Sequence, residues 1–314
     1  MLGRTANGLF WMFRYLERAE NTARLLEAAL RMALTRDLVA AEAEWRSVIA
    51  TLGLQQPFEA TNESYDGLSV WNFVLRGPSN PGNVRAMFGA VRANARTART
   101  NISSDVWEAV NDNWMKLDKL LARPVGQTAV GEVLGTIRRA GTQVHGAFDG
   151  SMLRDEGYHF SRAGTFIERA DSTARILDMK YFLLLPSLSY VGSSLDTGQW
   201  EQVLRSVAGA RVYSWLNAGQ IEARGIVDFL VLDDRFPRSL AFCRSALREN
   251  LAALARMHGV EGRCNALMRD ADTRISDLTV DQIFDQGLHE FLVDFLARNA
   301  AISRAIAEDY RFHA

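Results

Sequence analysis

Apolar residues recur at intervals of three and four along most of this chain, a spacing that predicts helices. The clearest example is a long helix over residues 9–36. Its apolar stripe consists of Met12, Leu16, Ala19, Ala23, Leu26 and Leu30. Phe10, Phe13 and Leu25 lie on its other faces, which indicates a central helix contacted on several sides. No alternating strand pattern occurs along the chain, so we predict an all-α protein.

Turn signals divide the rest of the chain into further predicted helices. Ser103-Ser104-Asp105 has the composition of an N-cap, and the glycines and prolines of residues 77–83 break the preceding helical pattern. The predicted helices cover residues 37–55, 65–76, 84–102, 128–147 and one or two segments of 278–309, with another directly after the Ser103 cap.

One stretch of the first helix occurs twice in the chain. Residues 15–26 read YLERAENTARLL and residues 166–177 read FIERADSTARIL, a shift of 151 positions that keeps seven of the twelve residues. Weaker matches follow in the same order at a shift of 156, among them Phe73 with Phe229 and Asn94 with Asn250. The change in shift predicts a small insertion within residues 186–194.

The duplication sets the predicted architecture. We expect a helical bundle that arose by internal tandem duplication and forms a single domain over residues 1–314. Its two pseudo-equivalent halves, about 1–150 and 151–314, would share one core.

The repeated stretch is rich in paired charges. The candidate site or buried ion-pair cluster consists of Glu17, Arg18, Glu20, Arg24 and the second-copy residues Glu168, Arg169, Asp171 and Arg175. Glu20 and Arg24 are spaced i,i+4, as are Asp171 and Arg175, which favours ion pairs within each helix. If neighbouring helices cover these groups, each charge needs a partner. We expect Glu17 to reach Arg175, and Glu168 to reach Arg24, about a pseudo-twofold axis.

Two interpretations of this cluster stay open. In the first, the carboxylates and guanidiniums form a buried network that fixes the register of the helices. In the second, they surround a polar pocket that binds a charged ligand or supplies acid–base groups. Because Arg favours bidentate recognition of carboxylate and phosphate, an acidic peptide or a phosphorylated ligand would suit such a pocket.

A basic stripe adds secondary candidates. Arg85, Arg92 and Arg99 recur every seven residues on the predicted helix 84–102, and they form either a solvated face or an anion-binding wall. His159 is the histidine nearest the Glu-Arg stretch. The secondary candidates are Asn80, Asn94, Arg96, His159 and Arg238.

Composition excludes several classes of function. A hydrophobic content of 48% and a charged content of 23% are ordinary globular values. The formal net charge of −1 gives no reason to expect a nucleic-acid or membrane partner. The two cysteines and five histidines show no metal-binding spacing, so we expect no metal or cofactor. No nucleotide-binding loop or nucleophile motif indicates catalytic residues. Without a long apolar run, a cytoplasmic location is expected.

Several motifs together resemble one bacterial family. They are MLGRTA at 1–6, WMFRYLERAENTAR at 11–24, Asn80-Pro81, ANAR at 93–96, Trp107-Glu108, FIERADSTAR at 166–175, VDFL at 227–230 and FPRS at 236–239. The chain is similar to the alpha-E family, named for its helical content and its Glu-Arg motif. Gly164-Thr165 departs from the family pattern, which more often has a larger polar or basic residue there.

The resemblance implies a context for the protein. Alpha-E members occur beside, or fused to, circularly permuted ATP-grasp ligases, often near transglutaminase-like proteins and peptidases. We therefore expect a helical accessory or scaffold component of an ATP-grasp-linked peptide-synthesis or protein-modification system. Its Glu-Arg helices would bind the ligase or its acidic peptide substrate, and a transglutaminase-like protein is a further expected partner. The alternatives are an enzyme that acts on the peptide product through the cluster, and a small-molecule anion-binding module.

Overall fold

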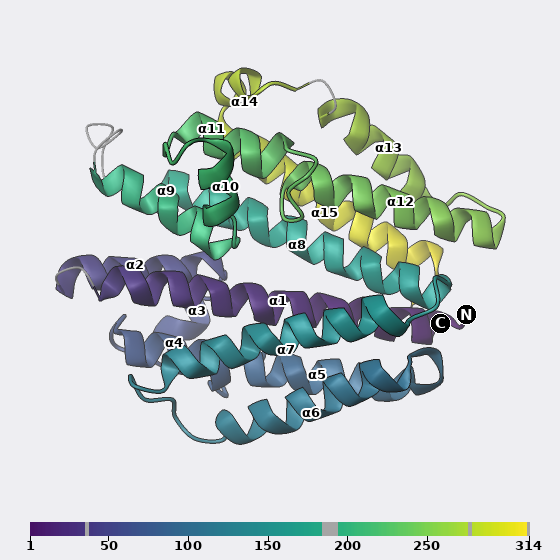
Figure 1. The fold of residues 1–314 in the computed structure, drawn as a ribbon, viewed down its shortest axis with the longest axis horizontal. Coiled ribbons are helices and arrows are strands. Elements are labelled where there is room, and N and C mark those ends of the chain that lie inside the picture. The colour runs from purple at the N-terminus through teal and green to yellow at the C-terminus, as the bar shows by residue number, and fades with distance from the viewer. Residues whose placement is uncertain (35–37, 184–193, 276–277, 313–314) are drawn as a thin grey trace. The chain divides into compact units, whose positions relative to one another are not determined.

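The computed structural model describes residues 1–34, 38–183, 194–275 and 278–312. Within these ranges every regular element is a helix, so the predicted all-α class is confirmed. The chain divides into two compact units: unit 1 is Met1–Arg14 with Leu153–Ala314, and unit 2 is Tyr15–Met152. The first helix, α1 (Gly3–Ala33), contributes to both units (Figure 1). The repeat halves predicted from the sequence stay a prediction.

Unit 2 is built around consecutive helices. Besides the later part of α1 it contains α2 (Leu38–Thr51), α3 (Gln55–Glu59), α4 (Gly67–Arg76), α5 (Val84–Thr97), the 3-10 turn η1 (Arg99–Asn101), α6 (Ser104–Leu120) and α7 (Val130–Ser151). Helix α6 packs against both α5 and α7. Trp45 and Trp71 meet edge to face at 5.8 Å, and Trp71 Nε1 donates to the carbonyl of Val125 at 2.8 Å. Both indoles are thereby buried with the Trp71 N–H satisfied.

Unit 1 is organised around the second long helix. Its elements are α8 (Glu156–Leu183), α9 (Ser194–Ser206), α10 (Ala210–Leu216), α11 (Ala223–Val227), the π-helical turn η3 (Asp228–Leu232), α12 (Leu240–His258), α13 (Arg263–Ile275), α14 (Val280–Gln286) and α15 (Leu288–Asp309). Helix α8 contacts both α12 and α15, and α13 contacts these same two helices (Figure 1). The start of α1 joins this core, because the Phe10 ring lies 5.5 Å from that of Phe312.

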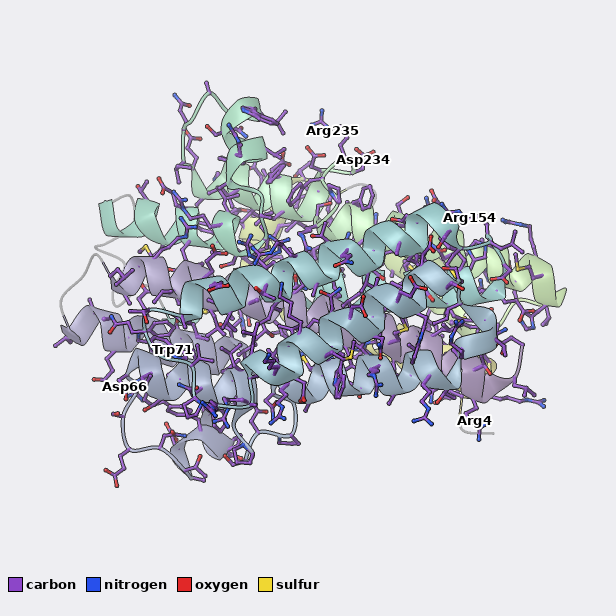
Figure 2. All side chains as sticks on the ribbon, turned by 60° about the horizontal axis from the view of Figure 1, so that its bottom comes forward. Arg4, Asp66, Trp71, Arg154, Asp234 and Arg235 are labelled. Atoms are coloured by element: carbon purple, nitrogen blue, oxygen red, sulfur yellow. The ribbon has the colours of Figure 1, made fainter. Side chains whose placement is uncertain are left out.

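Short polar side chains cap several helices. Ser103 accepts from the backbone N–H of Val106 at 3.2 Å, as its N-cap composition predicts. Asp66 caps α4 by accepting from the N–H of Ser69 at 2.9 Å. Figure 2 labels Asp66 together with Trp71, which lies further along the same helix. These caps satisfy donors that a helix leaves open at its first turn.

Some predicted helix boundaries differ from those observed. Helix α1 begins at Gly3 rather than near residue 9, since Ala6 and Phe10 are buried in the core of unit 1. The segment 37–55 is interrupted after Thr51, where Gly53 takes φ 68°. The segment 84–102 leaves the α-helical form after Thr97. The insertion predicted within 186–194 lies, apart from Ser194, outside the described residues.

Gly164 has a packing role in unit 1. A Cβ at this position would collide with the carbonyl oxygen of Phe10 and lie 3.0 Å from its carbonyl carbon. The backbone of α1 at Phe10 therefore lies where a side chain on residue 164 of α8 would be, and only glycine leaves that space free.

Candidate functional site

The first copy of the Glu-Arg motif lies on the part of α1 that belongs to unit 2. Glu17 and Glu20 are one turn apart, and their exposed fractions are 0% and 4%. Arg18 on the same turn is half-buried. A carboxylate that is removed from water costs free energy unless partners compensate it, so the groups around these two side chains decide their role.

Helix α7 supplies the neighbours of these carboxylates. His145 Nε2 lies 3.6 Å from Glu17 Oε2. Gly141 precedes His145 by one turn, and a Cβ on Gly141 would collide with Glu20 Oε2 and lie 3.2 Å from Glu20 Cδ. The missing side chain at Gly141 therefore leaves room for the carboxylate of Glu20 beside the α7 backbone.

Arg24 holds the other oxygen of Glu20. Its Nη2 and Nε both donate to Glu20 Oε1, at 2.5 and 3.2 Å, which is the i,i+4 pair that the spacing predicts. One ligand atom each from Glu17, Glu20 and His145 lies within 4.8 Å of the others, in an arrangement that could hold a metal ion. Sequence spacing indicated no such group, because His145 comes from a helix far along the chain.

The second copy of the motif, in unit 1, has a different partner. Glu168 is 2% exposed, and Arg14 Nε and Nη2 both lie 2.9 Å from its Oε2. The third nitrogen of Arg14, Nη1, donates to Ser303 Oγ at 3.0 Å, and the guanidinium lies 4.5 Å from the Trp11 ring centroid. Arg14 was not among the predicted site residues, although it stands three residues before the first motif glutamate.

The remaining second-copy charges, on Arg169, Asp171 and Arg175, have partners within unit 1. Arg175 is exposed and donates to Asp171 at 2.7 Å, again i,i+4. Arg169 donates to the carbonyl of Pro237 at 3.2 Å, and Thr173 donates to the carbonyl of Arg238 at 2.8 Å. These contacts attach α8 to the turn that precedes α12.

The cross-pairing expected from the pseudo-twofold axis would join the two units. It would connect Glu17 with Arg175 and Glu168 with Arg24, and each pair has one residue in unit 1 and one in unit 2. Within their own units, Arg24 and Arg175 have partners on their own helices, Glu20 and Asp171. The cross-pairing itself stays a prediction.

The secondary candidates mostly stabilise local structure. Asn80 is buried and its Oδ1 accepts from the N–H of Gly82 at 3.0 Å, inside the turn before α5. His159 Nδ1 lies 2.8 Å from Asn250 Oδ1 in unit 1. Asn94 is half-buried on α5, whereas Arg96 is exposed.

The basic stripe of α5 faces helix α6. Arg85 Nε donates to Asp118 at 2.8 Å, and Arg92 Nε donates to Asn111 at 2.9 Å. The Arg92 guanidinium also lies 4.4 Å from the centroid of the Trp114 ring. Arg85 and Arg92 therefore bind residues of α6.

Unit 1 contains a cavity of about 190 Å³ between α8, α12, α13 and α15. Its apolar lining includes Phe166, Leu247, Met268, Phe291, Phe295 and Ile302. Arg244, Arg274 and Arg298 also line it, and they pair with Asp272, Asp270 and Asp294, respectively. The cavity thus combines an apolar body with three guanidiniums, each of which has a carboxylate partner.

Arg244 is the most enclosed of these three cations. Its Nε lies 2.9 Å from Asp272 Oδ1, whereas its buried Nη1 has no hydrogen-bond acceptor among the described residues. Burial lowers the pKa of the Arg244 guanidinium, and the nearby Asp272 acts in the opposite direction. An anion in the cavity could supply an acceptor for Nη1.

No helix in the described part of the chain combines the length and apolar content that a bilayer crossing needs.

Comparison with known proteins gives a family profile and several relatives. Residues 1–310 match the Alpha-E profile, described as a predicted alpha-helical domain with a conserved ER motif. An uncharacterised protein of Mycobacterium bovis is 24% identical over 327 residues, covering 97% of this chain and 36% of the relative. Uncharacterised proteins of two Mycobacterium tuberculosis strains match over the same shares at 24% and 23% identity. No solved structure gives a significant match.

Proposed function

Because the chain belongs to the alpha-E family of helical domains with an ER motif, we propose that it serves an ATP-grasp-linked peptide-synthesis or protein-modification system. In this role it is a helical accessory component that binds a circularly permuted ATP-grasp ligase or the ligase's acidic peptide substrate. A transglutaminase-like protein is a further partner in the proposal. A cytoplasmic location belongs to it as well, since Cys243 and Cys264 are both free thiols.

The observation that supports this proposal is that the relatives are much longer than this chain. The chain spans 36% of the curated mycobacterial relatives that it matches, so in those proteins the helical region is joined to a longer stretch of other sequence. Joining two parts in one polypeptide keeps them at a high effective concentration. Such joining is expected when a helical part and a second part act on the same substrate.

The charge pairing supports an accessory role over a catalytic one. Arg14 compensates Glu168, Arg24 compensates Glu20, and Arg175 compensates Asp171, each pair within its own unit. Carboxylates held in this way are typical of a network that fixes helix register. Substrate recognition would then fall to other groups of the Glu-Arg helices, such as Phe166 and Ala170 of α8, which line the cavity of unit 1.

Direct binding tests the proposal. We expect the purified chain to bind the purified circularly permuted ATP-grasp ligase of its own organism, or that enzyme's acidic peptide substrate, with micromolar or better affinity in calorimetry. Co-purification from native cells, with the ligase identified by mass spectrometry, is the matching cellular measurement. Absence of binding to both ligase and peptide would overturn the proposal. Turnover of the peptide by the chain alone, without ATP, would instead favour the enzyme alternative.

The cavity of unit 1 favours a second candidate, a module that binds small anions. An apolar pocket with convergent polar groups is the usual form of a small-molecule site. Here the ligand would have an apolar body between Phe166 and Phe291 and a carboxylate that accepts from Arg244 Nη1.

Calorimetry with octanoate as a probe tests the second candidate. We expect binding by the wild-type chain and at least about tenfold weaker binding by Arg244→Met, because a charged hydrogen bond contributes about 1.5–3 kcal/mol and about 1.4 kcal/mol is tenfold. Arg175→Met is the matched control, since Arg175 is an exposed cation of the same unit outside the cavity. Equal octanoate affinity in the wild-type and Arg244→Met proteins would eliminate this candidate.

A further inference from the structure

Two carboxylates and one imidazole converge between α1 and α7 inside unit 2. One oxygen of Glu17, one oxygen of Glu20 and one ring nitrogen of His145 all lie within 4.8 Å of one another. Both glutamates are buried, and the side chain of His145 is 15% exposed. The network interpretation does not by itself require an imidazole beside two carboxylates.

The donor set is that of a transition-metal site. Imidazole nitrogen and carboxylate oxygen are both ligands of Zn²⁺, at about 2.0–2.2 Å, and three protein ligands with one open position are common for this ion. Two such ligands on a tetrahedral ion lie about 3.4 Å apart. Glu17 Oε2 and His145 Nε2 are already 3.6 Å apart. Ca²⁺ fits poorly because it takes six to eight oxygen ligands.

The two helices are shaped to bring these groups together. Glu17 and Glu20 are spaced i,i+3 on α1, so they leave the helix on one face. Gly141 and His145 are spaced i,i+4 on α7, so they also share a face. Gly141 provides the space that Glu20 Oε2 occupies, and Arg24 holds the other oxygen, Oε1. Glu20 Oε2 is therefore directed toward the helix that carries the imidazole.

We propose that Glu17, Glu20 and His145 bind one divalent transition-metal ion, with Zn²⁺ as the preferred ion and an exchangeable fourth position. The site goes beyond the accessory role proposed above and does not depend on it. Bound metal would join α1 to α7 and stabilise unit 2. The general affinity order rises from Mn²⁺ to Cu²⁺ and falls again at Zn²⁺, so the preference for Zn²⁺ rests on the ligand types and the four-coordinate geometry.

The second copy of the motif offers an internal control. Glu168 corresponds to Glu17 in the repeat, but the guanidinium of Arg14 occupies both contacts to its Oε2. The positively charged Arg14 side chain therefore already pairs with Glu168. Replacing Glu168 should leave metal binding unchanged, whereas replacing Glu17 should weaken it.

Metal titration of the chelator-treated full chain tests the proposal. We expect calorimetry and elemental analysis to give one Zn²⁺ per chain, together with a raised melting temperature. Co²⁺ should bind at the same position and give the visible absorption of a site with nitrogen and oxygen ligands. Glu17→Gln and His145→Gln should each weaken Zn²⁺ binding at least about tenfold, which even loss of outer-shell groups achieves in known sites.

Two matched pairs of variants separate a metal ligand from a structural residue. Glu168→Gln and His159→Gln should keep the wild-type affinity, because both residues lie in unit 1 with other partners. Gly141→Ala should weaken binding by displacing Glu20, whereas Gly146→Ala on the same helix should not. A Cβ at Gly146 would meet no described atom within 4 Å.

Two results would overturn the proposal. The first is that the wild-type chain binds neither Zn²⁺ nor Co²⁺ at a tenfold molar excess. The second is that Glu17→Gln and His145→Gln bind Zn²⁺ as tightly as Glu168→Gln does. If the Glu17 or His145 variants fail to fold, the Co²⁺ spectrum of the wild-type chain decides alone: nitrogen and oxygen ligation supports the site, and a spectrum of hexaaqua Co²⁺ refutes it.

Discussion

Single charged residues determine how each motif copy is neutralised. Arg14 makes two contacts to one oxygen of Glu168 and a third contact to Ser303, while its guanidinium lies over Trp11. Glu168 is 2% exposed, so water cannot replace this guanidinium. At the scale of residues, the stability of α8 inside unit 1 therefore depends on a side chain from α1.

Arg14→Ala should lower the free energy of unfolding by about 3–5 kcal/mol, because it leaves a buried carboxylate without its cation. Urea denaturation followed by circular dichroism measures this. Arg175→Ala serves as the control and should cost at most about 1 kcal/mol, since Arg175 and Asp171 form a pair near the surface. Adding Glu168→Gln to Arg14→Ala should recover part of the loss. Equal effects of the two single Arg variants would contradict this account of Glu168.

The lowered pKa of Asp66 makes the stability of the protein depend on pH. Burial alone would raise the pKa of Asp66, but hydrogen bonds from Ser64 and Ser69 outweigh it and hold the pKa below its usual value. A lowered folded-state pKa contributes stability above the unfolded-state pKa, near 3.9, and this contribution is lost as the pH falls.

Asp66→Ala should cost about 1 kcal/mol at neutral pH, because α4 loses its N-cap. The difference in unfolding free energy from wild type should shrink as the pH falls below about 4, the usual pKa of an unfolded-state Asp, and then through the lower folded-state pKa. Thermal or urea unfolding at several pH values measures it. Asp66→Asn keeps a capping oxygen, so it should stay close to wild type near pH 7. A constant difference from pH 7 to pH 3 would rule out this role of the carboxylate.

At the scale of elements, close helix contact at Gly164 fixes how α8 packs on the start of α1. A methyl group there meets backbone atoms of Phe10, which cannot rotate away as a side chain would. The contact belongs wholly to unit 1.

Gly164→Ala should destabilise the protein by about 1–3 kcal/mol, the usual cost of overpacking, despite the better helix propensity of alanine. Gly146→Ala on α7 is the matched control and should be neutral or stabilising by up to about 1 kcal/mol. Chemical denaturation of both variants measures the difference. A neutral Gly164→Ala would show that α1 and α8 separate at little cost.

The sequence predicts helices better than it predicts their contacts. The apolar stripe containing Leu16 and Ala23 identified α1, because its period follows from helix geometry alone. The start of α1 at Gly3 was missed, since residues 3–8 have weak helix propensity and fold through burial of Ala6.

The same limit applies to the candidate site. Glu17 and Glu20 were predicted from a repeated motif within one helix. The sequence analysis missed His145, Gly141 and Arg14. Their roles arise from contacts between separate helices, and the spacing of residues along one helix does not predict such contacts. Asn80, in contrast, was a reasonable candidate that serves as a turn residue.

At the scale of the whole molecule, α1 belongs to two compact units. It places Phe10 in the core of unit 1, and its later part buries Leu26 in unit 2. Neither unit can unfold completely without breaking part of this helix. The tandem duplication stays a prediction, which is supported by long helices α1 and α8 carrying the two motif copies.

Because both units contain part of α1, we expect unit 1 and unit 2 to unfold together. Leu251→Ala in unit 1 and Leu117→Ala in unit 2 should each cost about 2–5 kcal/mol, because both side chains are buried. Differential scanning calorimetry should show both variants shifting one common transition. Two separate transitions, each moved by only one of the variants, would contradict the coupling.

The discontinuity of unit 1 also has a consequence for synthesis on the ribosome. Residues 15–152 can complete unit 2 as soon as they emerge, but Phe10 must wait for Phe312, whose ring also packs against Phe160. At about 5–20 residues per second this delay lasts on the order of ten seconds or more. During that time the apolar side chains in the first turns of α1 remain accessible to chaperones, until Phe312 is synthesised and packs against Phe10.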